Sequence, residues 1–250
     1  MKIRGDTKQA EEVLSDILFF PIIKEDQNQK INNKEIDTLI QELITSKEFD
    51  PEVNKTYMIQ TYNNIKPKKI LLLGLGKNPN SEDTRQAYAT GIRVAKQVKA
   101  KIVSVIFPKQ KFPQSAVEGM ILGNYKFEEF KKDKKPSTIK EIIILDQKEV
   151  KQIIHNASSI CSAVMLTRDL VNNPSNKKTP KNLVDISKKI AKETNLKIKI
   201  LDKKQMQKLG MDAILAVNQG SVHDPYVVIL EYTPHKDKKN ICLIGKGITF

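Results

Sequence analysis

The chain has 250 residues, of which 39% are hydrophobic and 29% charged, so its composition excludes a wholly disordered protein and supports a packed core. Its net charge of +14 comes from 43 Lys and Arg against 29 Asp and Glu, and most of the excess is lysine. No apolar run approaches the ~20 residues that a membrane helix needs, and the N-terminus lacks the apolar stretch of a signal peptide. We therefore expect a cytoplasmic protein with no membrane segment.

The first part of the chain alternates between strand and helix patterns. Continuous apolar strands such as "ILLL" favour a sheet that is covered on both faces, as in α/β proteins. Two neighbouring strands at 57–63 and 68–76 are close enough in sequence to form an antiparallel pair. We expect Ser81 to be the N-cap of the helix that follows them. The expected strands cover 15–22, 57–63, 68–76, 101–107 and 139–146, and the expected helices cover 32–46, 81–100 and 114–130.

The second part repeats the α/β pattern over a shorter length. A long helix is expected from Lys148 to Leu170, where "NNP" at 172–174 stops it. A second helix begins with Thr179 as N-cap and Pro180 at its first position. A short helix is expected at 202–211, and strands at 196–201, 226–232 and 240–247. Because the last strand is apolar on both faces with no helix after it, we expect a half-built sheet and two domains, 1–146 and 147–250.

Most candidate chemical motifs have simple structural explanations. The turn from Gly74 to Lys77 matches nucleotide-binding loops only weakly, and a tight strand-to-helix turn accounts for it. His155, His223 and His235 have no second histidine at a ligand spacing, which argues against histidine-bound zinc. No nucleophile-elbow motif is present. The two cysteines, Cys161 and Cys242, lie in apolar surroundings, so we expect buried free thiols.

Lys246 is the sharpest candidate. It follows the apolar run "ICLI" and lies between Gly245 and Gly247. Ligands of α/β sheets bind beyond the carboxyl ends of strands, and glycines there permit close approach. The spacing by itself leaves two interpretations open, a functional lysine and an ordinary lysine of a surface turn.

Four segments resemble the leucyl aminopeptidase (cytosol aminopeptidase) family, in order and at matching spacing: "TRDLVNNPSNKKTP" at 167–180, "LGMDAILAVNQGS" at 209–221, "VVILEY" at 227–232 and "IGKGITF" at 244–250. "LLLGLGK" and "AVEGMILGNYKFEEFK" are similar to the family's N-terminal domain. The resemblance implies an α/β fold, with a smaller N-terminal domain followed by a truncated α/β/α metallopeptidase domain. It also implies peptide substrates, a hexamer, and two divalent metal ions, zinc or manganese.

In this family the lysine of the glycine-flanked motif is a metal ligand, and the resemblance carries that role to Lys246. The family's metal-binding carboxylates lie downstream of the position that matches Phe250, so we expect this chain alone to lack peptidase activity. An alternative from another class is a basic nucleic-acid-binding or regulatory module, which steep loss of DNA binding with added salt would support. A weaker alternative is nucleotide binding at residues 74–77.

Overall fold

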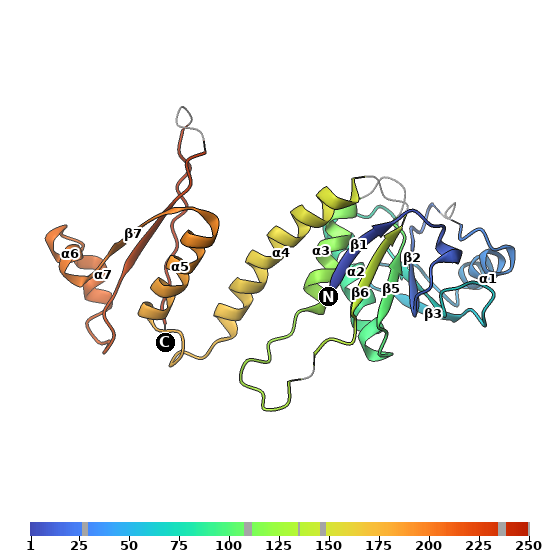
Figure 1. Cartoon of the computed structure of the whole chain (residues 1–250), viewed down its shortest axis with the longest axis horizontal. Helices are drawn as coiled ribbons and strands as arrows, with labels where there is room; N and C mark the ends of the chain where they lie inside the picture. Colours follow the sequence, from blue (N-terminus) through green and yellow to red (C-terminus); the bar gives the residue numbers. More distant parts are fainter. Residues whose placement is uncertain (27–29, 108–111, 135, 146–148, 235–238, 250) are drawn as a thin grey trace. The chain divides into compact units, whose positions relative to one another are not determined.

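The computed structural model describes residues 1–26, 30–107, 112–134, 136–145, 149–234 and 239–249 (Figure 1). The contacts within the chain divide it into two units, Met1–Thr167 and Arg168–Phe250. We call them unit 1 and unit 2. None of the helices in the described stretches is both long and apolar enough to cross a membrane.

Unit 1 is built on a six-stranded sheet with the order β1-β6-β5-β2-β4-β3. All neighbouring strands are parallel except β3 and β4, whose antiparallel pairing agrees with the prediction from their proximity in sequence. The strands are β1 Lys2–Asp6, β2 Ile17–Ile22, β3 Thr56–Gln60, β4 Lys69–Gly74, β5 Ile102–Val105 and β6 Glu141–Leu145. β1 was not predicted, since its sequence "KIRGD" has little apolar content, and it is held by its pairing with β6.

Helices cover both faces of this sheet, as the continuous apolar strands predict. Two neighbouring residues of β2 show that both faces are buried. Phe19 packs into one apolar cluster and Phe20 into the other, because successive side chains of a strand point to opposite faces. The helices are α1 Lys34–Thr45, α2 Ser81–Gln97, α3 Pro113–Asn124 and α4 Val150–Asn172, with the 3-10 turn η1 Ala10–Glu12. Residues of α1 pack in the cluster of Phe20, whereas α2, α3 and the beginning of α4 pack in the cluster of Phe19.

The N-cap of α2 differs from the prediction, and α3 ends at Asn124 although the sequence predicts a helix to residue 130. The N-cap of α2 is Asn80, not Ser81, because the Asn80 side chain accepts hydrogen bonds from the amides of Glu82 and Asp83. Asp83 completes the capping box by accepting from the Asn80 amide. The predicted first residue of α4, Lys148, lies outside the described residues.

Unit 2 carries a much smaller sheet. Its elements are α5 Pro180–Thr194, β7 Lys197–Leu201, α6 Lys203–Lys208, α7 Asp212–Val217 and β8 Val227–Glu231. Thr179 caps α5 with Pro180 at the first position, as the sequence predicts, and Asp202 caps α6. β7 and β8 form an antiparallel pair, with Leu201 opposite Val227. The expectation of a half-built sheet agrees with this two-stranded arrangement.

The border between the units falls within α4. The first turns of α4 contribute Val150, Ile153, Ile154 and Ala157 to the core of unit 1, which is why the contacts divide the chain after Thr167. The division into folding domains at 146/147 remains a prediction. Ile160, which follows these residues in α4, is exposed.

Candidate functional site

The segment around Lys246 does not form the strand that the sequence predicts at 240–247. Residues 239–249 have no regular secondary structure, and Lys246 is exposed. The side chains of Ile241, Leu243 and Ile244 are 90%, 93% and 94% exposed. A strand is stable only with a partner for its backbone groups, and among the described residues of unit 2 β8 pairs with β7 alone. The prediction of a strand at 240–247 was therefore wrong for this chain.

The glycines beside Lys246 are not needed for close packing. A Cβ on Gly245 would meet no atom within 4 Å, and one on Gly247 would lie 3.9 Å from Leu183 Cδ1 of α5. Among the described residues, no other part of the backbone lies close to either glycine. The expectation of close approach at this position finds no support in the described geometry.

The donor atoms needed for a two-metal centre do not come together in the described parts of the chain. There, no group of three or more His, Cys, Asp or Glu side chains is placed to hold a metal ion. Two metal ions held close together require several ligands, chiefly carboxylate oxygens, and one amine cannot supply them. The described residues therefore do not fit a two-metal group, and the role of Lys246 as a metal ligand stays a prediction.

The other predicted reactive side chains differ in their exposure. Cys161 is buried and Cys242 is exposed, and both are free thiols. The expectation of two buried thiols is thus wrong for Cys242, whose apolar neighbours are themselves exposed. His155 and His223 are exposed, and His235 lies outside the described residues.

The glycine-rich turn after β4 is explained by packing. A Cβ on Gly74 would lie 2.2 Å from the backbone oxygen of Glu52, and Gly76 has a φ of +77°. Lys77 pairs with Glu25 at 2.6 Å. Residues 51–53 lie so close to this turn that both of its positions require glycine. A phosphate ligand is not needed to account for the two glycines.

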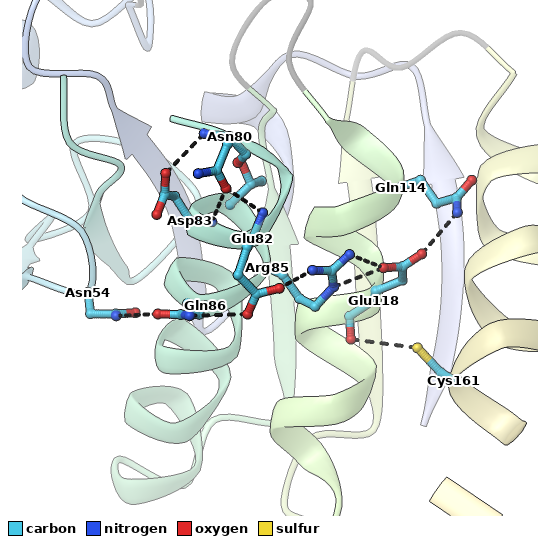
Figure 2. A network of polar contacts seen from close by, with 10 residues as sticks. Asn54, Asn80, Glu82, Asp83, Arg85, Gln86, Gln114, Glu118 and Cys161 are labelled. Carbon is cyan, nitrogen blue, oxygen red and sulfur yellow. Dashed lines mark hydrogen bonds and ion pairs between the residues drawn. The ribbon is translucent and has the colours of Figure 1, made fainter. Parts of the chain in front are cut away.

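A polar network that the sequence analysis missed joins α2, α3 and α4 (Figure 2). Glu118 of α3 is buried, and its Oε2 accepts hydrogen bonds from Arg85 Nε at 2.9 Å and Nη2 at 2.8 Å. Its Oε1 accepts from Gln114 Nε2 at 2.9 Å. The thiol of Cys161 donates to the Glu118 backbone oxygen at 3.7 Å. The one signal in the sequence is an acidic residue within the apolar run "SAVEGM".

This network is structural in character. Burial disfavours the charge of Arg85, but hydrogen bonds to Glu118 and Glu82 outweigh that effect and raise the pKa of the guanidinium. Both oxygens of Glu118 are occupied by donors from the protein itself. Gly119 brings α3 close to α2, since a Cβ there would lie 2.2 Å from the backbone oxygen of Arg85. The network thus links three helices and leaves no free carboxylate oxygen for substrate.

Comparison with known proteins assigns the chain to a class. The family model described as "Cytosol aminopeptidase family, N-terminal domain" matches residues 20–134, and the one described as "Cytosol aminopeptidase family, catalytic domain" matches residues 165–250. The probable cytosol aminopeptidase of Alkaliphilus oremlandii is 32% identical over all of this chain and 54% of its own length. That of a Sulfurihydrogenibium species is 29% identical over all of this chain and 53% of its own length. The chain therefore spans about half the length of these curated relatives.

Solved structures agree in fold. A tomato leucine aminopeptidase mutant, K354E, superposes with a TM-score of 0.80 at 25% identity, over 96% of this chain and 52% of its own. The bottromycin maturation enzyme BotP in complex with Mn gives a TM-score of 0.70 at 19% identity, over 88% of this chain and 45% of its own, a likeness of fold alone.

These matches define an α/β chain with the N-terminal domain of this family followed by part of its catalytic domain. The chain belongs to the cytosol aminopeptidase family. The resemblance found in the sequence and the predicted fold class are both confirmed.

Proposed function

We propose that this chain is part of a metal-dependent aminopeptidase that releases N-terminal amino acids, of the leucine type, from peptides. The observation that carries the proposal is the pair of family matches at 20–134 and 165–250, which together span most of the chain. The names of the relatives support the cytosol as its location. Peptides are the proposed substrates and a homo-hexamer the proposed assembly of the whole protein. Nucleic-acid binding through the basic surface remains the alternative.

The proposed cofactors of the whole enzyme are two divalent metal ions, manganese or zinc. When bound, such ions activate a water molecule and polarise the scissile carbonyl. From this chain we propose Lys246 as one ligand, on the family resemblance of the segment 244–250. Its exposure leaves the amine accessible, but no cluster of metal-binding side chains surrounds it within the described residues.

The 250-residue chain by itself is expected to be inactive, because one lysine cannot hold two cations close together. The purified chain should release no nitroaniline from leucine p-nitroanilide at millimolar substrate with added manganese. Lys246→Ala is the matched control for background hydrolysis. Turnover by the unaltered chain above the level of Lys246→Ala would show that the described residues do complete a peptidase site.

A further inference from the structure

The parallel strands of unit 1 all begin at one edge of its sheet. β1, β6, β5, β2 and β4 follow one another with their first residues aligned to within one position. The Lys2 amide donates to the Lys140 carbonyl oxygen and the Lys140 amide to that of Lys101, both at 2.8 Å, and the Lys68 amide donates to that of Ser15 at 3.0 Å. The segments before these strands therefore lie side by side. We call the described residues of 1–2, 13–16, 61–68, 98–101, 125–134 and 136–140 the amino edge.

The amino edge is rich in exposed lysine. Its loops at 61–68 and 98–101 contain four lysines and no acidic residue, and the segment 125–140 contains six lysines against three acidic residues. Six exposed lysines lie at or next to the beginnings of strands: Lys2, Lys66, Lys68, Lys99, Lys101 and Lys140.

The acidic groups near this edge do not balance its charge. Asp16 accepts from Lys68 and from two backbone amides. In the segment 125–140, Glu128 pairs with Lys126. The Lys66 amide donates to the carbonyl oxygen of Glu11, so the turn η1 borders the edge without covering it. The amino edge therefore keeps a strong positive charge.

Exposed apolar side chains gather at the same edge. Among the described residues of unit 1, nine large hydrophobic side chains are exposed. Five of the nine belong to the amino edge: Met1, Leu14, Tyr62, Val98 and Phe130. They come from five separate segments of the chain, so the fold collects them and no single apolar stretch of sequence does. Exposed apolar residues that are scattered singly are ordinary, whereas a group of them among lysines indicates an interaction surface.

Two aromatic rings are held outward at this edge. Tyr62 has a φ of +48° in a tight turn closed by the hydrogen bond from the Asn64 amide to the Thr61 carbonyl oxygen, a conformation unfavourable for a bulky residue, and its side chain is 85% exposed. Phe130 lies edge-to-face on Phe127, with the ring centroids 5.9 Å apart, and is 53% exposed. Figure 1 shows the loop between α3 and β6 extending beyond the beginning of β6.

We propose that the amino edge of unit 1 binds the surface of a membrane that contains anionic phospholipids. The lysines are attracted to the anionic headgroups, and the apolar side chains enter the boundary between headgroups and acyl chains. This binding goes beyond the proposed peptidase function and does not depend on it.

The mixture of charge and aliphatic surface favours a membrane over other partners. A nucleic acid offers its bases to aromatic rings, but few contacts to the aliphatic side chains of Met1, Leu14 and Val98. A second copy of this chain, docked through the same edge, would place lysines against lysines. A bilayer surface accommodates both the charge and the aliphatic side chains.

The test is sedimentation of the full 250-residue chain with vesicles of equal parts phosphatidylglycerol and phosphatidylcholine, and with vesicles of phosphatidylcholine alone. We expect binding to the first kind only, and weaker binding as salt is raised, because salt screens the attraction of lysines to the headgroups.

A charge variant removes three lysines of the amino edge: Lys66→Gln, Lys99→Gln and Lys101→Gln. It should bind anionic vesicles about tenfold more weakly or worse. Its matched control removes three exposed lysines that follow β1 or precede β3, and so lie toward the opposite edge: Lys8→Gln, Lys47→Gln and Lys55→Gln. The control should bind as the unaltered chain does.

An apolar variant keeps every lysine and removes three exposed side chains of the amino edge: Leu14→Ser, Tyr62→Ser and Phe130→Ser. It should also bind about tenfold more weakly or worse, because insertion of apolar surface is lost. Its matched control alters exposed apolar side chains elsewhere in unit 1 and should bind normally: Leu39→Ser, Phe112→Ser and Ile160→Ser.

Three results would overturn the proposal. The first is that the unaltered chain fails to sediment with anionic vesicles. The second is an apolar variant that binds them as tightly as the unaltered chain, since charge alone would then hold the protein; equal binding of that variant to a DNA duplex would assign the edge to nucleic acid. The third is an equal loss of binding in the control variants, which would place the contact elsewhere. Peptidase activity is measured separately and does not decide the outcome.

Discussion

Glu118 and Arg85 show how a charged pair can be held inside a helical layer. The carboxylate is almost completely covered, and it survives there because Arg85 and Gln114 donate to both of its oxygens. Removing one partner of a buried ion pair leaves the other charge without compensation, which costs more than the pair itself contributes. The pair is therefore sensitive to mutation although it lies far in sequence from Lys246.

Arg85→Ala should destabilise unit 1 by about 2–3 kcal/mol, a value reduced from the fully buried case because the Arg85 side chain is 29% exposed. Urea denaturation followed by circular dichroism measures it. Arg93→Ala, on the same helix, removes an exposed arginine whose guanidinium bonds to Thr90 and should cost under about 0.5 kcal/mol. Equal midpoints for the two variants would contradict the structural role of the Arg85–Glu118 pair.

Gly74 is a position where only glycine fits. Gly74→Ala places a methyl group 2.2 Å from a backbone oxygen, which cannot move aside as a side chain could. We expect a loss of about 1–3 kcal/mol in the free energy of unfolding, measured by urea denaturation. Gly220→Ala is the control, since its Cβ would meet nothing within 4 Å, and it should change stability by no more than about 0.5 kcal/mol. A neutral Gly74→Ala would mean that the turn opens easily and would reinstate it as a possible ligand loop.

Asp16 gives unit 1 a dependence on pH. Burial acts to raise its pKa, but hydrogen bonds from Lys68 and from the backbone amides of Lys101 and Ile102 outweigh burial and lower the pKa below its ordinary value. A carboxylate with a depressed folded-state pKa stabilises the protein above its unfolded pKa, near 3.8, and this contribution is lost as the pH falls through the folded-state value.

Asp16→Asn should therefore cost about 1–2 kcal/mol at pH 7, through loss of charge-assisted hydrogen bonds. The difference from the unaltered protein should shrink as the pH falls from about 4 through the lower folded-state pKa of Asp16, because the carboxyl becomes neutral first in the unfolded and then in the folded state. Urea denaturation at several pH values checks this. Glu12→Gln makes the same change of charge at an exposed carboxylate and should show no such convergence. A cost for Asp16→Asn that is constant from pH 7 to pH 3 would contradict the electrostatic explanation.

At the scale of elements, the sequence predicts best where local patterns decide the structure. The buried strands β2, β4 and β6, the antiparallel pairing of β3 with β4, and the Thr179 cap of α5 all follow from apolar runs and capping residues within a few positions. The cap of α2 shows the limit of this reasoning. Asn80 and Ser81 are both good capping residues, and the backbone conformation selects Asn80.

The elements that the sequence misjudges depend on partners distant in the chain. β1 has little strand character and exists because β6 pairs with it, whereas residues 240–247 have strong strand character and no strand partner within the described part of unit 2. The same reasoning applies to the candidate site. Lys246 can be named from the family resemblance, but the side chains that would surround it in a metal centre cannot be derived from the segment 244–250.

At the scale of the whole molecule, the two units differ in how much apolar surface they bury. In unit 1, two apolar clusters lie on opposite faces of one six-stranded sheet, which gives its central strands cover on both sides. In unit 2, a two-stranded sheet and three helices bury a few side chains. Since burial of apolar surface is the main stabilising contribution to folding, unit 1 carries most of the stability of this chain.

Hydrogen exchange of the isolated chain should therefore resolve the two units. Amides of β2 and β4 exchange only when unit 1 unfolds, whereas those of β8 exchange through local opening of a small hairpin. We expect amides of β8 to exchange about a hundredfold faster or more, since each 1.4 kcal/mol of opening free energy corresponds to a factor of ten. Arg85→Ala serves as an internal control, because it should accelerate exchange in β2 and β4 while leaving β8 unchanged. If β8 and β2 were equally protected, and Arg85→Ala accelerated exchange in both, the 250 residues would unfold as one cooperative body. The exposed apolar side chains of unit 2 would then cause no measurable loss of stability.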